Sequence, residues 1–143
     1  MRFAWDLARG YSPRRYPSDA RLGPVVAVAD EWAGSDGDIV SAAIQALRIR
    51  SLVGTRTWGG VVGIDGKYEL VDGTSVTQPR FSFWLEDKGW GVENHGVDPD
   101  IEVEFPPQDR VAGRDPQLDA AIQVALDALE ATPAVTAPEL PPI

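Results

Sequence analysis

The clearest indication of the fold lies in residues 24–55, which read PVVAVADEWAGSDGDIVSAAIQALRIRSLVGT. Residues 24–29 form a short β-branched run between Gly-Pro and a polar loop, a pattern typical of a buried strand. Apolar residues then recur at helical spacing and predict a helix: Ile39, Val40, Ala43, Ile44 and Leu47. A second short strand is predicted over 52–55, so the stretch predicts one βαβ unit of about 30 residues.

After residue 59 the turn residues favour β-structure. Two Asp-Gly pairs separate short apolar runs and predict hairpin turns, because Asp and Gly tolerate positive φ: Asp65-Gly66 and Asp72-Gly73. Alternating apolar and polar residues predict strands over 81–85 and 101–105. A final helix is predicted over 115–129, where Asp115 can cap the first turn. Its apolar stripe consists of Leu118, Ile122, Ala125, Leu126 and Leu129.

Taken together, these elements predict an α/β fold with a βαβ unit, a β-rich hairpin region and a C-terminal helix. Residues 1–22, rich in Pro, Arg and Tyr, read as a leading linker segment; the alternative is a basic-aromatic patch for nucleic acid. Residues 23–131 are expected to form the α/β domain. Residues 132–143 hold four prolines and are expected to be a disordered tail.

The composition is acidic and lacks cysteine. The 143 residues hold 13 Lys+Arg against 22 Asp+Glu, a formal net charge of −9, which argues against a nucleic-acid partner. The absence of Cys removes disulfides and thiolate metal sites, and the single His, His95, excludes paired-His metal motifs. Apolar runs are far shorter than the ~20 residues that span a bilayer, so we expect a soluble protein without a membrane partner.

The loop before the predicted helix holds the best candidate for chemistry. Ser35 lies there with glycines nearby, at a helix N-terminus where free N–H groups stabilise negative charge. If Ser35 attacked a carbonyl, the Asp36 N–H would point at the developing oxyanion. The pattern resembles a nucleophile elbow, although Ala33 replaces the first Gly of GxSxG. The alternative is that Ser35 only caps the helix, since Ser35 and Asp38 together have the form of a capping signal.

A glycine-rich loop at 54–60 is a weaker candidate. A phosphate site would need a Lys where Gly60 stands, so nucleotide binding is a distant possibility. We expect this loop to pack its backbone against the Ser35 loop instead.

The polar loop 89–100 contains acid and base residue types without a diagnostic spacing. Glu93 and His95 could be an acid and a base, but a separation of two residues does not by itself make a relay. Asp98 and Asp100 are more typical of a turn than of a cation site, because too few further oxygen ligands are specified.

Six segments are more specific together than any single motif. In order they are EWAGSDGDI (31–39), GTRTWGGVVGI (54–64), LVDGT (70–74), TQPRFSFW (77–84), GWGVENHGVDPD (89–100) and GRDPQLD (113–119). Together they resemble the C-terminal catalytic part of the tricorn protease family, in the tail-specific protease superfamily of serine peptidases. The likeness covers residues 20–131 and implies a crotonase- or ClpP-like subdomain.

The resemblance implies a role for four residues. Ser35 matches the family's nucleophile, and Asp36 matches the residue whose N–H forms one half of the oxyanion hole. Glu93 matches the acid of a Ser-His-Ser-Glu tetrad, where it binds the second Ser, which in turn orients the His. Asp6 matches by spacing an acidic residue that selects basic substrate side chains and reaches in from a neighbouring subunit.

Two departures from related patterns are informative. Tail-specific relatives use a Ser-Lys dyad, and Gly60 fills the position of that Lys, which indicates the tricorn branch. The family's catalytic His and its neighbouring Ser lie in an earlier region, ahead of a PDZ domain, and His95 does not match that His. The other oxyanion N–H, which a Gly upstream donates in the family, is missing as well. The chain is therefore expected to be the last subdomain of a larger peptidase and to be inactive alone.

The function implied by the resemblance is cleavage of short peptides in a cytoplasmic homo-oligomer that includes upstream domains. No metal or organic cofactor is implied. The alternative from another class is a non-catalytic interaction or oligomerisation module. In that interpretation Ser35 caps its helix and the glycine loops are structural.

Overall fold

A computed structural model of the chain describes residues 4–141, which pack as two units. One unit is Val26–Ile122, and the other combines the N-terminal residues up to Val25 with the residues from Gln123 onward. The expected boundaries at residues 22, 23 and 131 stay a prediction. The structure shows a mixed α/β fold, and its assignment to the crotonase type also stays a prediction.

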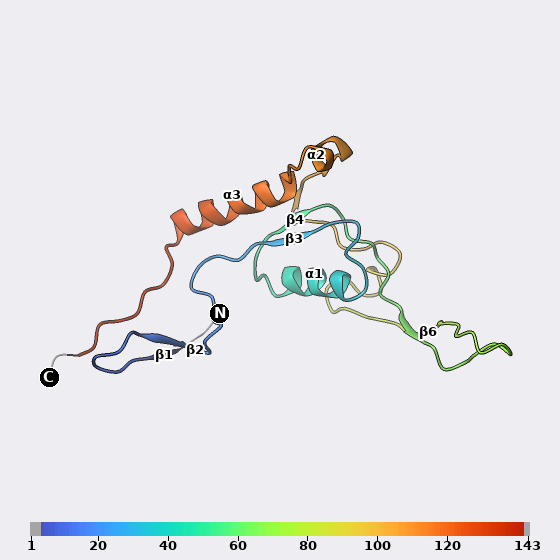
Figure 1. Cartoon of the computed structure of the whole chain (residues 1–143), viewed down its shortest axis with the longest axis horizontal. Helices are drawn as coiled ribbons and strands as arrows, with labels where there is room; N and C mark the ends of the chain where they lie inside the picture. The colour runs from blue at the N-terminus through green and yellow to red at the C-terminus, as the bar shows by residue number, and fades with distance from the viewer. Residues whose placement is uncertain (1–3, 142–143) are drawn as a thin grey trace. The chain divides into compact units, whose positions relative to one another are not determined.

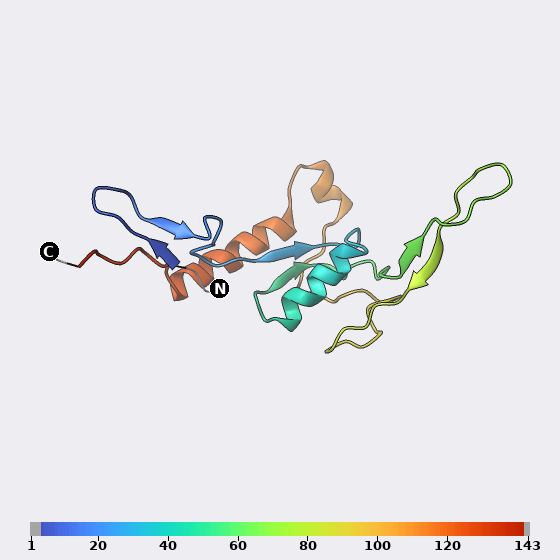
Figure 2. The ribbon, with the colours of Figure 1, turned by 90° about the horizontal axis from the view of Figure 1, so that it is seen from below.

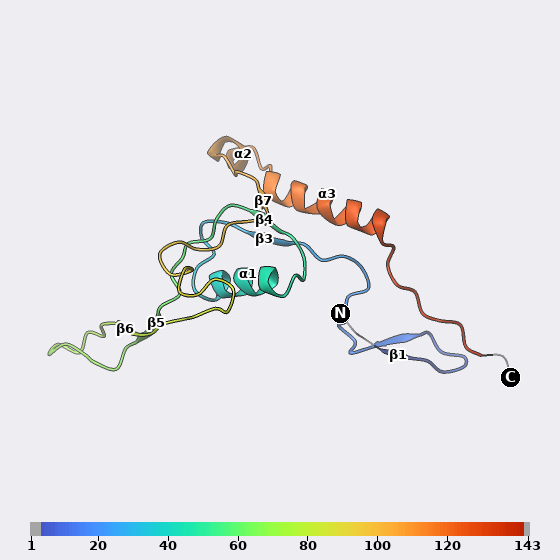
Figure 3. The same cartoon turned by 180° about the vertical axis from the view of Figure 1, so that it is seen from behind.

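The larger unit is built on the predicted βαβ arrangement. β3 (Ala27–Ala29) and β4 (Leu52–Gly54) pair in parallel, and α1 (Asp36–Ala46) connects them and packs against both. β7 (Ile101–Glu102) adds a parallel strand on the other side of β4, giving the order β3-β4-β7. Figure 3 labels all three strands beside α1. The predicted βαβ unit is confirmed.

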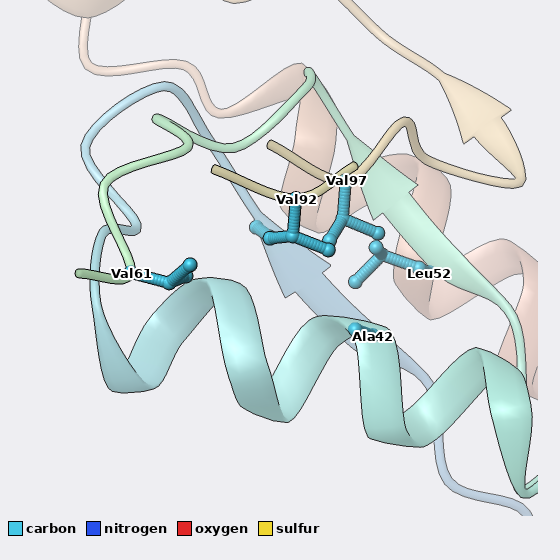
Figure 4. Close-up of a cluster of buried hydrophobic side chains, with 6 residues drawn as sticks. Ala42, Leu52, Val61, Val92 and Val97 are labelled. Carbon is cyan, nitrogen blue, oxygen red and sulfur yellow. The ribbon is translucent and has the colours of Figure 1, made fainter. Parts of the chain in front are cut away.

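A small apolar core lies between α1 and β4. Figure 4 shows side chains from both elements meeting side chains from two loops. The buried cluster consists of Ala29, Ala42, Leu52, Val61, Val92 and Val97. Val61 and the pair Val92 and Val97 belong to loops, so burial of these residues fixes the backbone of both loops against the βαβ unit. This matters because Gly60 precedes Val61 and Glu93 follows Val92 in the sequence.

An antiparallel hairpin extends away from the core in Figure 2. β5 (Gly63–Asp65) pairs with β6 (Gln78–Phe81), and Asp65 lies opposite Gln78. The predicted turn at Asp65-Gly66 is therefore wrong, since the chain continues outward beyond this pair. The turn at Asp72-Gly73 is confirmed: Gly73 has φ 81°, and the Leu70 N–H donates to the Thr74 carbonyl at 2.9 Å.

The later β-structure is shorter than the alternation of residues predicts. The strand expected over 81–85 ends at Phe81, because its pairing with β5 ends at Gly63 opposite Phe81. The chain then turns at 85–89, where the Gly89 N–H donates to the Leu85 carbonyl. The strand expected over 101–105 is reduced to β7. α2 (Pro107–Val111), labelled in Figure 1, has no counterpart in the prediction.

The predicted C-terminal helix is present as α3 (Pro116–Ala131). The Leu118 N–H donates to Asp115 Oδ1 at 2.9 Å, so the predicted cap is confirmed. The predicted stripe is not enclosed: its four largest side chains are 38–53% exposed, namely Leu118, Ile122, Leu126 and Leu129. Across the described ranges, no helix combines the length and apolarity needed to cross a lipid bilayer.

The smaller unit contains a hairpin where a linker segment was predicted. β1 (Ala4–Asp6) pairs antiparallel with β2 (Arg14–Tyr16), with Ala4 opposite Tyr16. At the other end of the chain, residues 132–141 form no helix or strand, and the Val135 N–H donates to the Leu22 carbonyl. Residues 142–143 of the predicted tail and residues 1–3 of the predicted linker lie outside the described residues.

Candidate active site

Ser35 stands on a sharp turn between β3 and α1. Its backbone has φ 55° and ψ −114°, a conformation that residues with a Cβ rarely adopt. Such strained residues gather at functional sites, where the surrounding structure holds them. The residue is exposed, and its side chain makes no capping hydrogen bond to the helix. The prediction that the Ser35 side chain caps the helix is therefore wrong, because that side chain makes no hydrogen bond to the first turn.

The Ser35 turn is held by the glycine-rich loop, as the sequence predicted. The Ser35 N–H donates to the Gly60 carbonyl at 3.1 Å, and the Trp58 N–H donates to the Ala33 carbonyl at 3.1 Å. These two bonds join the 33–35 and 58–60 backbones side by side. The conformation of Ser35 thus depends on a segment more than twenty residues away.

Asp36 places an amide next to the Ser35 hydroxyl. It is the first residue of α1, so its N–H has no acceptor within the helix. Both residues are exposed, and the N-terminal end of a helix favours negative charge. An exposed hydroxyl next in the chain to the first N–H of a helix is the arrangement that acyl transfer requires of a nucleophile and an oxyanion donor.

Glu93 is half-buried and accepts two backbone hydrogen bonds with one oxygen. Its Oε2 lies 2.8 Å from both the Val61 and the Val62 nitrogens. Among the residues that the structure describes, Oε1 has no hydrogen-bond partner. Glu93 lines a cavity of about 360 Å³ together with Val62, Ser82, Phe83, Trp90 and Asn94. One carboxylate oxygen is thus structural, and the other remains available for a further donor.

A single peptide group connects Ser35 to Glu93. The Gly60 carbonyl accepts from the Ser35 N–H, and the Val61 N–H of the same peptide donates to Glu93 Oε2. The C=O and N–H of a trans peptide point in opposite directions, so the two residues bind opposite sides of it. Within the described part of the chain, Ser35 and Glu93 share no direct hydrogen bond. The structure therefore brings both residues to one loop without joining their side chains.

His95 lies in the same loop as Glu93 but is not paired with it. Its Nε2 lies 2.9 Å from Asp98 Oδ2, and both side chains are at least half exposed. Asp100 accepts hydrogen bonds from the Leu52 N–H and from Gln45, which gives its carboxylate a structural role. Over residues 4–141 no group of three or more His, Cys, Asp or Glu side chains is arranged to hold a metal ion.

Asp6 lies in the other unit of the chain. It is the last residue of β1, is exposed, and stands opposite Arg14 in the hairpin. Asp6 lines a hollow with residues 13–18. A role for Asp6 in substrate selection stays a prediction.

Asp38 is a residue that the sequence does not single out as part of this site. Its predicted part in a capping signal is wrong, since the side chain is 0% exposed and its carboxylate accepts hydrogen bonds from Thr57, Gly59 and Gly60. These partners follow it by about twenty positions, so no local pattern marks the contact. A hint is present in its position one turn before Ala42 of the core, because a carboxylate needs polar partners when buried.

Comparison with known proteins agrees with the resemblance found in the sequence. Residues 8–103 match the model of Peptidase family S41. The chain is 69% identical over 137 residues (96% of its length) to "Tricorn protease homolog 1" of Streptomyces coelicolor and covers 13% of that protein. It is 49% identical over 128 residues (90% of its length) to "Tricorn protease" of Thermoplasma acidophilum, of which it covers 12%. Against a solved structure, "Crystal structure of the tricorn protease", the TM-score is 0.86 at 48% identity, over 91% of this chain and 13% of that one. The chain thus spans only 12–13% of the length of these relatives.

Proposed function

Since this chain belongs to peptidase family S41 and is similar to tricorn proteases along most of its length, we propose that it carries the nucleophile of a tricorn-type serine peptidase. The observation that carries the proposal is Ser35 itself. An exposed hydroxyl on a residue with φ 55° and ψ −114°, beside the first N–H of a helix, fits attack on a carbonyl and not helix capping.

The reaction proposed for the complete enzyme is acyl transfer to Ser35. Oγ forms a bond to the peptide carbonyl carbon as its proton passes to a His base, and the Asp36 N–H stabilises the oxyanion. Collapse of the tetrahedral intermediate breaks the C–N bond, and the amine leaves with the proton from the His. Water then attacks the acyl-enzyme and releases the second product.

The His is proposed to come from a segment that precedes this chain in its relatives. His95 is not proposed as the base, because no hydrogen bond joins its ring to Ser35 or Glu93 among the described residues. Glu93 is proposed to bind a second Ser from that same segment, which would orient the His. Two features of Glu93 support this. Its Oε1 has no hydrogen-bond partner among the described residues. Glu93 and Ser35 bind opposite sides of the 60–61 peptide, so further side chains would be needed to link the Glu93 carboxylate to the Ser35 hydroxyl.

The substrates proposed are short peptides, and Asp6 is proposed to favour basic side chains before the scissile bond. The exposed carboxylate of Asp6 supports this, since an opposite charge would attract such a side chain. We also propose that upstream domains and further copies of the chain cover its apolar surface. Large exposed aromatic side chains support that proposal, at 57–78% exposure: Trp32, Trp58, Trp84 and Trp90.

The test is covalent labelling by a fluorophosphonate probe. The chain alone is expected to label slowly, because a Ser hydroxyl without a base is a poor nucleophile near neutral pH. Adding the upstream segment in trans is expected to restore labelling of the wild-type chain but not of Ser35→Ala. Rapid labelling of the isolated chain would overturn the proposed need for an external base. Equal labelling of Ser35→Ala and wild type would overturn the assignment of the nucleophile.

A non-catalytic interaction module is the second candidate, and the exposed aromatic residues are the observation that favours it. The Ser35→Ala substitution separates the two functions in the reconstituted peptidase. If Ser35 is the nucleophile, peptide turnover disappears while assembly with the upstream segment is retained. Unchanged turnover with intact assembly would favour the module.

A further inference from the structure

We infer that Asp38 is a positioning residue for this site: its buried carboxylate holds the 57–60 loop in the conformation that ties Ser35 to Glu93. The inference rests on the proposed function of Ser35 and Glu93 and deepens it. Asp38 itself has no access to substrate, since it is 0% exposed. Its effect is therefore transmitted through the loop that it binds.

Three donors from the 57–60 loop converge on this carboxylate. Oδ1 accepts the Thr57 hydroxyl at 2.5 Å and the Gly59 N–H at 2.8 Å. Oδ2 accepts the Gly60 N–H at 3.1 Å. An ionised carboxylate is an acceptor at both oxygens, so it satisfies all three donors at once. In a site without water access, loss of any one bond leaves a polar group without a partner.

Asp38 is connected to Ser35 and to Glu93 through two consecutive peptide groups. The 59–60 peptide donates its N–H to Asp38, and its carbonyl, on Gly59, accepts the Asn94 N–H at 2.7 Å. The next peptide, 60–61, accepts from Ser35 and donates to Glu93. Fixing the first peptide therefore limits rotation of the second. Asp38 thus holds the peptide directly before the one that both Ser35 and Glu93 bind.

Thr57 links Asp38 to the loop that contains Glu93. Its side chain is 3% exposed, and its hydroxyl donates to Asp38 while accepting the Val97 N–H at 2.8 Å. The Thr57 N–H also donates to the Val97 carbonyl at 3.1 Å. One carboxylate thus connects the first turn of α1, the 57–60 loop and the 92–97 loop. No second buried carboxylate serves these loops within the described ranges.

The experiment compares Asp38→Asn with Asp100→Asn in the chain and in the reconstituted peptidase. In Asp38→Asn the amide oxygen can still accept hydrogen bonds from Thr57 and Gly59, but the NH₂ group then faces the Gly60 N–H, so that two donors oppose each other. Asp100→Asn is the matched control. Its carboxylate also accepts a backbone N–H, from Leu52 at 2.7 Å, but on β4 and outside the Ser35 loop.

Amide hydrogen exchange of the chain gives the first readout. Asp38→Asn is expected to speed exchange at Ser35 and Val61 while exchange at Leu47, at the far end of α1, stays as in wild type. Asp100→Asn is expected to leave Ser35 and Val61 unchanged. Equal acceleration at Leu47 would mean that the whole fold loosens, and unchanged exchange at Ser35 would mean that Asp38 does not hold the turn. Either result overturns the inference.

Peptide turnover by the reconstituted peptidase gives the second readout. Asp38→Asn is expected to lower kcat about 100-fold with KM nearly unchanged, because a small misplacement of reacting groups has an effect of this size. Asp100→Asn is expected to keep wild-type kcat. If Asp38→Asn does not fold, Thr57→Val and Thr57→Ser replace it: Val removes the hydroxyl and is expected to lower kcat, whereas Ser retains it and is expected to restore kcat.

Failure of this inference is distinguishable from failure of the proposed function. If Ser35→Ala turns over peptide as wild type does, the proposed nucleophile is wrong, and the exchange rates at Ser35 and Val61 still test what Asp38 holds. If Ser35→Ala is inactive but Asp38→Asn keeps wild-type kcat and KM, the proposed nucleophile stands and the positioning role of Asp38 is overturned.

Discussion

The indole ring of Trp58 lies directly against the backbone of Gly34. A Cβ built at residue 34 would stand 2.4 Å from Trp58 Cε3, and one built at Gly60 would stand 2.8 Å from Cζ3 of the same ring. The ring therefore lies against Gly34, which precedes Ser35, and against Gly60, whose carbonyl accepts the Ser35 N–H. Trp58 is nevertheless 69% exposed, so much of its surface is open to solvent.

Replacing Gly34 with Ala is expected to lower the free energy of unfolding by about 1–3 kcal/mol, because the added methyl overlaps the ring. Urea denaturation of the chain measures this change. Gly66→Ala is the matched control, since a Cβ there meets nothing within 4 Å. Adding Trp58→Ala to Gly34→Ala is expected to recover most of the loss. Equal stability of Gly34→Ala and Gly66→Ala would show that the ring moves away without cost.

Replacing Ser35 with Gly is expected to stabilise the chain. A non-glycine residue in a sparsely populated φ/ψ region stores about 1–3 kcal/mol, of which the greater flexibility of Gly in the unfolded chain offsets about 0.5–1 kcal/mol. Ser35→Ala keeps a Cβ and is expected to stay within about 0.5 kcal/mol of wild type. Both are compared by urea denaturation, and a Gly variant less stable than the Ala variant would contradict the strain at this turn.

The effect of substituting Glu93 depends on whether an acceptor remains for Val61 and Val62. Glu93→Ala leaves both N–H groups without their acceptor and is expected to lower the free energy of unfolding by about 1–3 kcal/mol. Glu93→Gln retains a carbonyl oxygen and is expected to lose less. Hydrogen exchange at the two amides and urea denaturation measure the difference. Glu86→Ala, at an exposed position, is the control, and a Gln variant as unstable as the Ala variant would mean that the negative charge is what holds these amides.

The Asp72 turn is expected to loosen in acid. The Thr74 N–H, and then its hydroxyl, donate hydrogen bonds that hold the pKa of the Asp72 carboxylate below its ordinary value. A carboxylate with a lowered pKa in the folded state adds stability above its unfolded pKa and loses it as the pH falls through the folded pKa. Titration of the Thr74 amide by NMR is expected to show a midpoint below that of Asp72 in the unstructured peptide VDGTS. An equal or higher midpoint would contradict this hydrogen bond.

Local patterns in the sequence were sufficient for several elements. The βαβ unit follows from apolar spacing over 24–55, and the Asp115 cap and the Asp72-Gly73 turn form as predicted. In each case the deciding interactions join residues within a few positions, or bury one continuous apolar face. Propensity, periodicity and capping describe such interactions well.

Contacts between distant residues account for what those patterns missed. Asp65-Gly66 has the composition of a turn, yet pairing of Asp65 with Gln78 keeps the strand extended, because the ladder with β6 outweighs the local preference. The strand expected over 81–85 stops at Phe81, and a tight turn closed by Gly89 begins at Leu85. These outcomes depend on which segments meet in space.

The candidate site, too, follows partly from local sequence and partly from contacts between distant residues. From residue order alone, a Ser beside glycines at a helix N-terminus is recognisable, and the six matching segments point to Ser35, Asp36 and Glu93. Only the tertiary structure shows that Ser35 has a positive φ and that Asp38 is buried against a loop about twenty residues away. Folding also places Glu93 across one peptide from Ser35. A hydrogen bond between distant segments leaves no periodic trace in a sequence, because its strength depends on burial and alignment, which arise only once the core has closed around both partners.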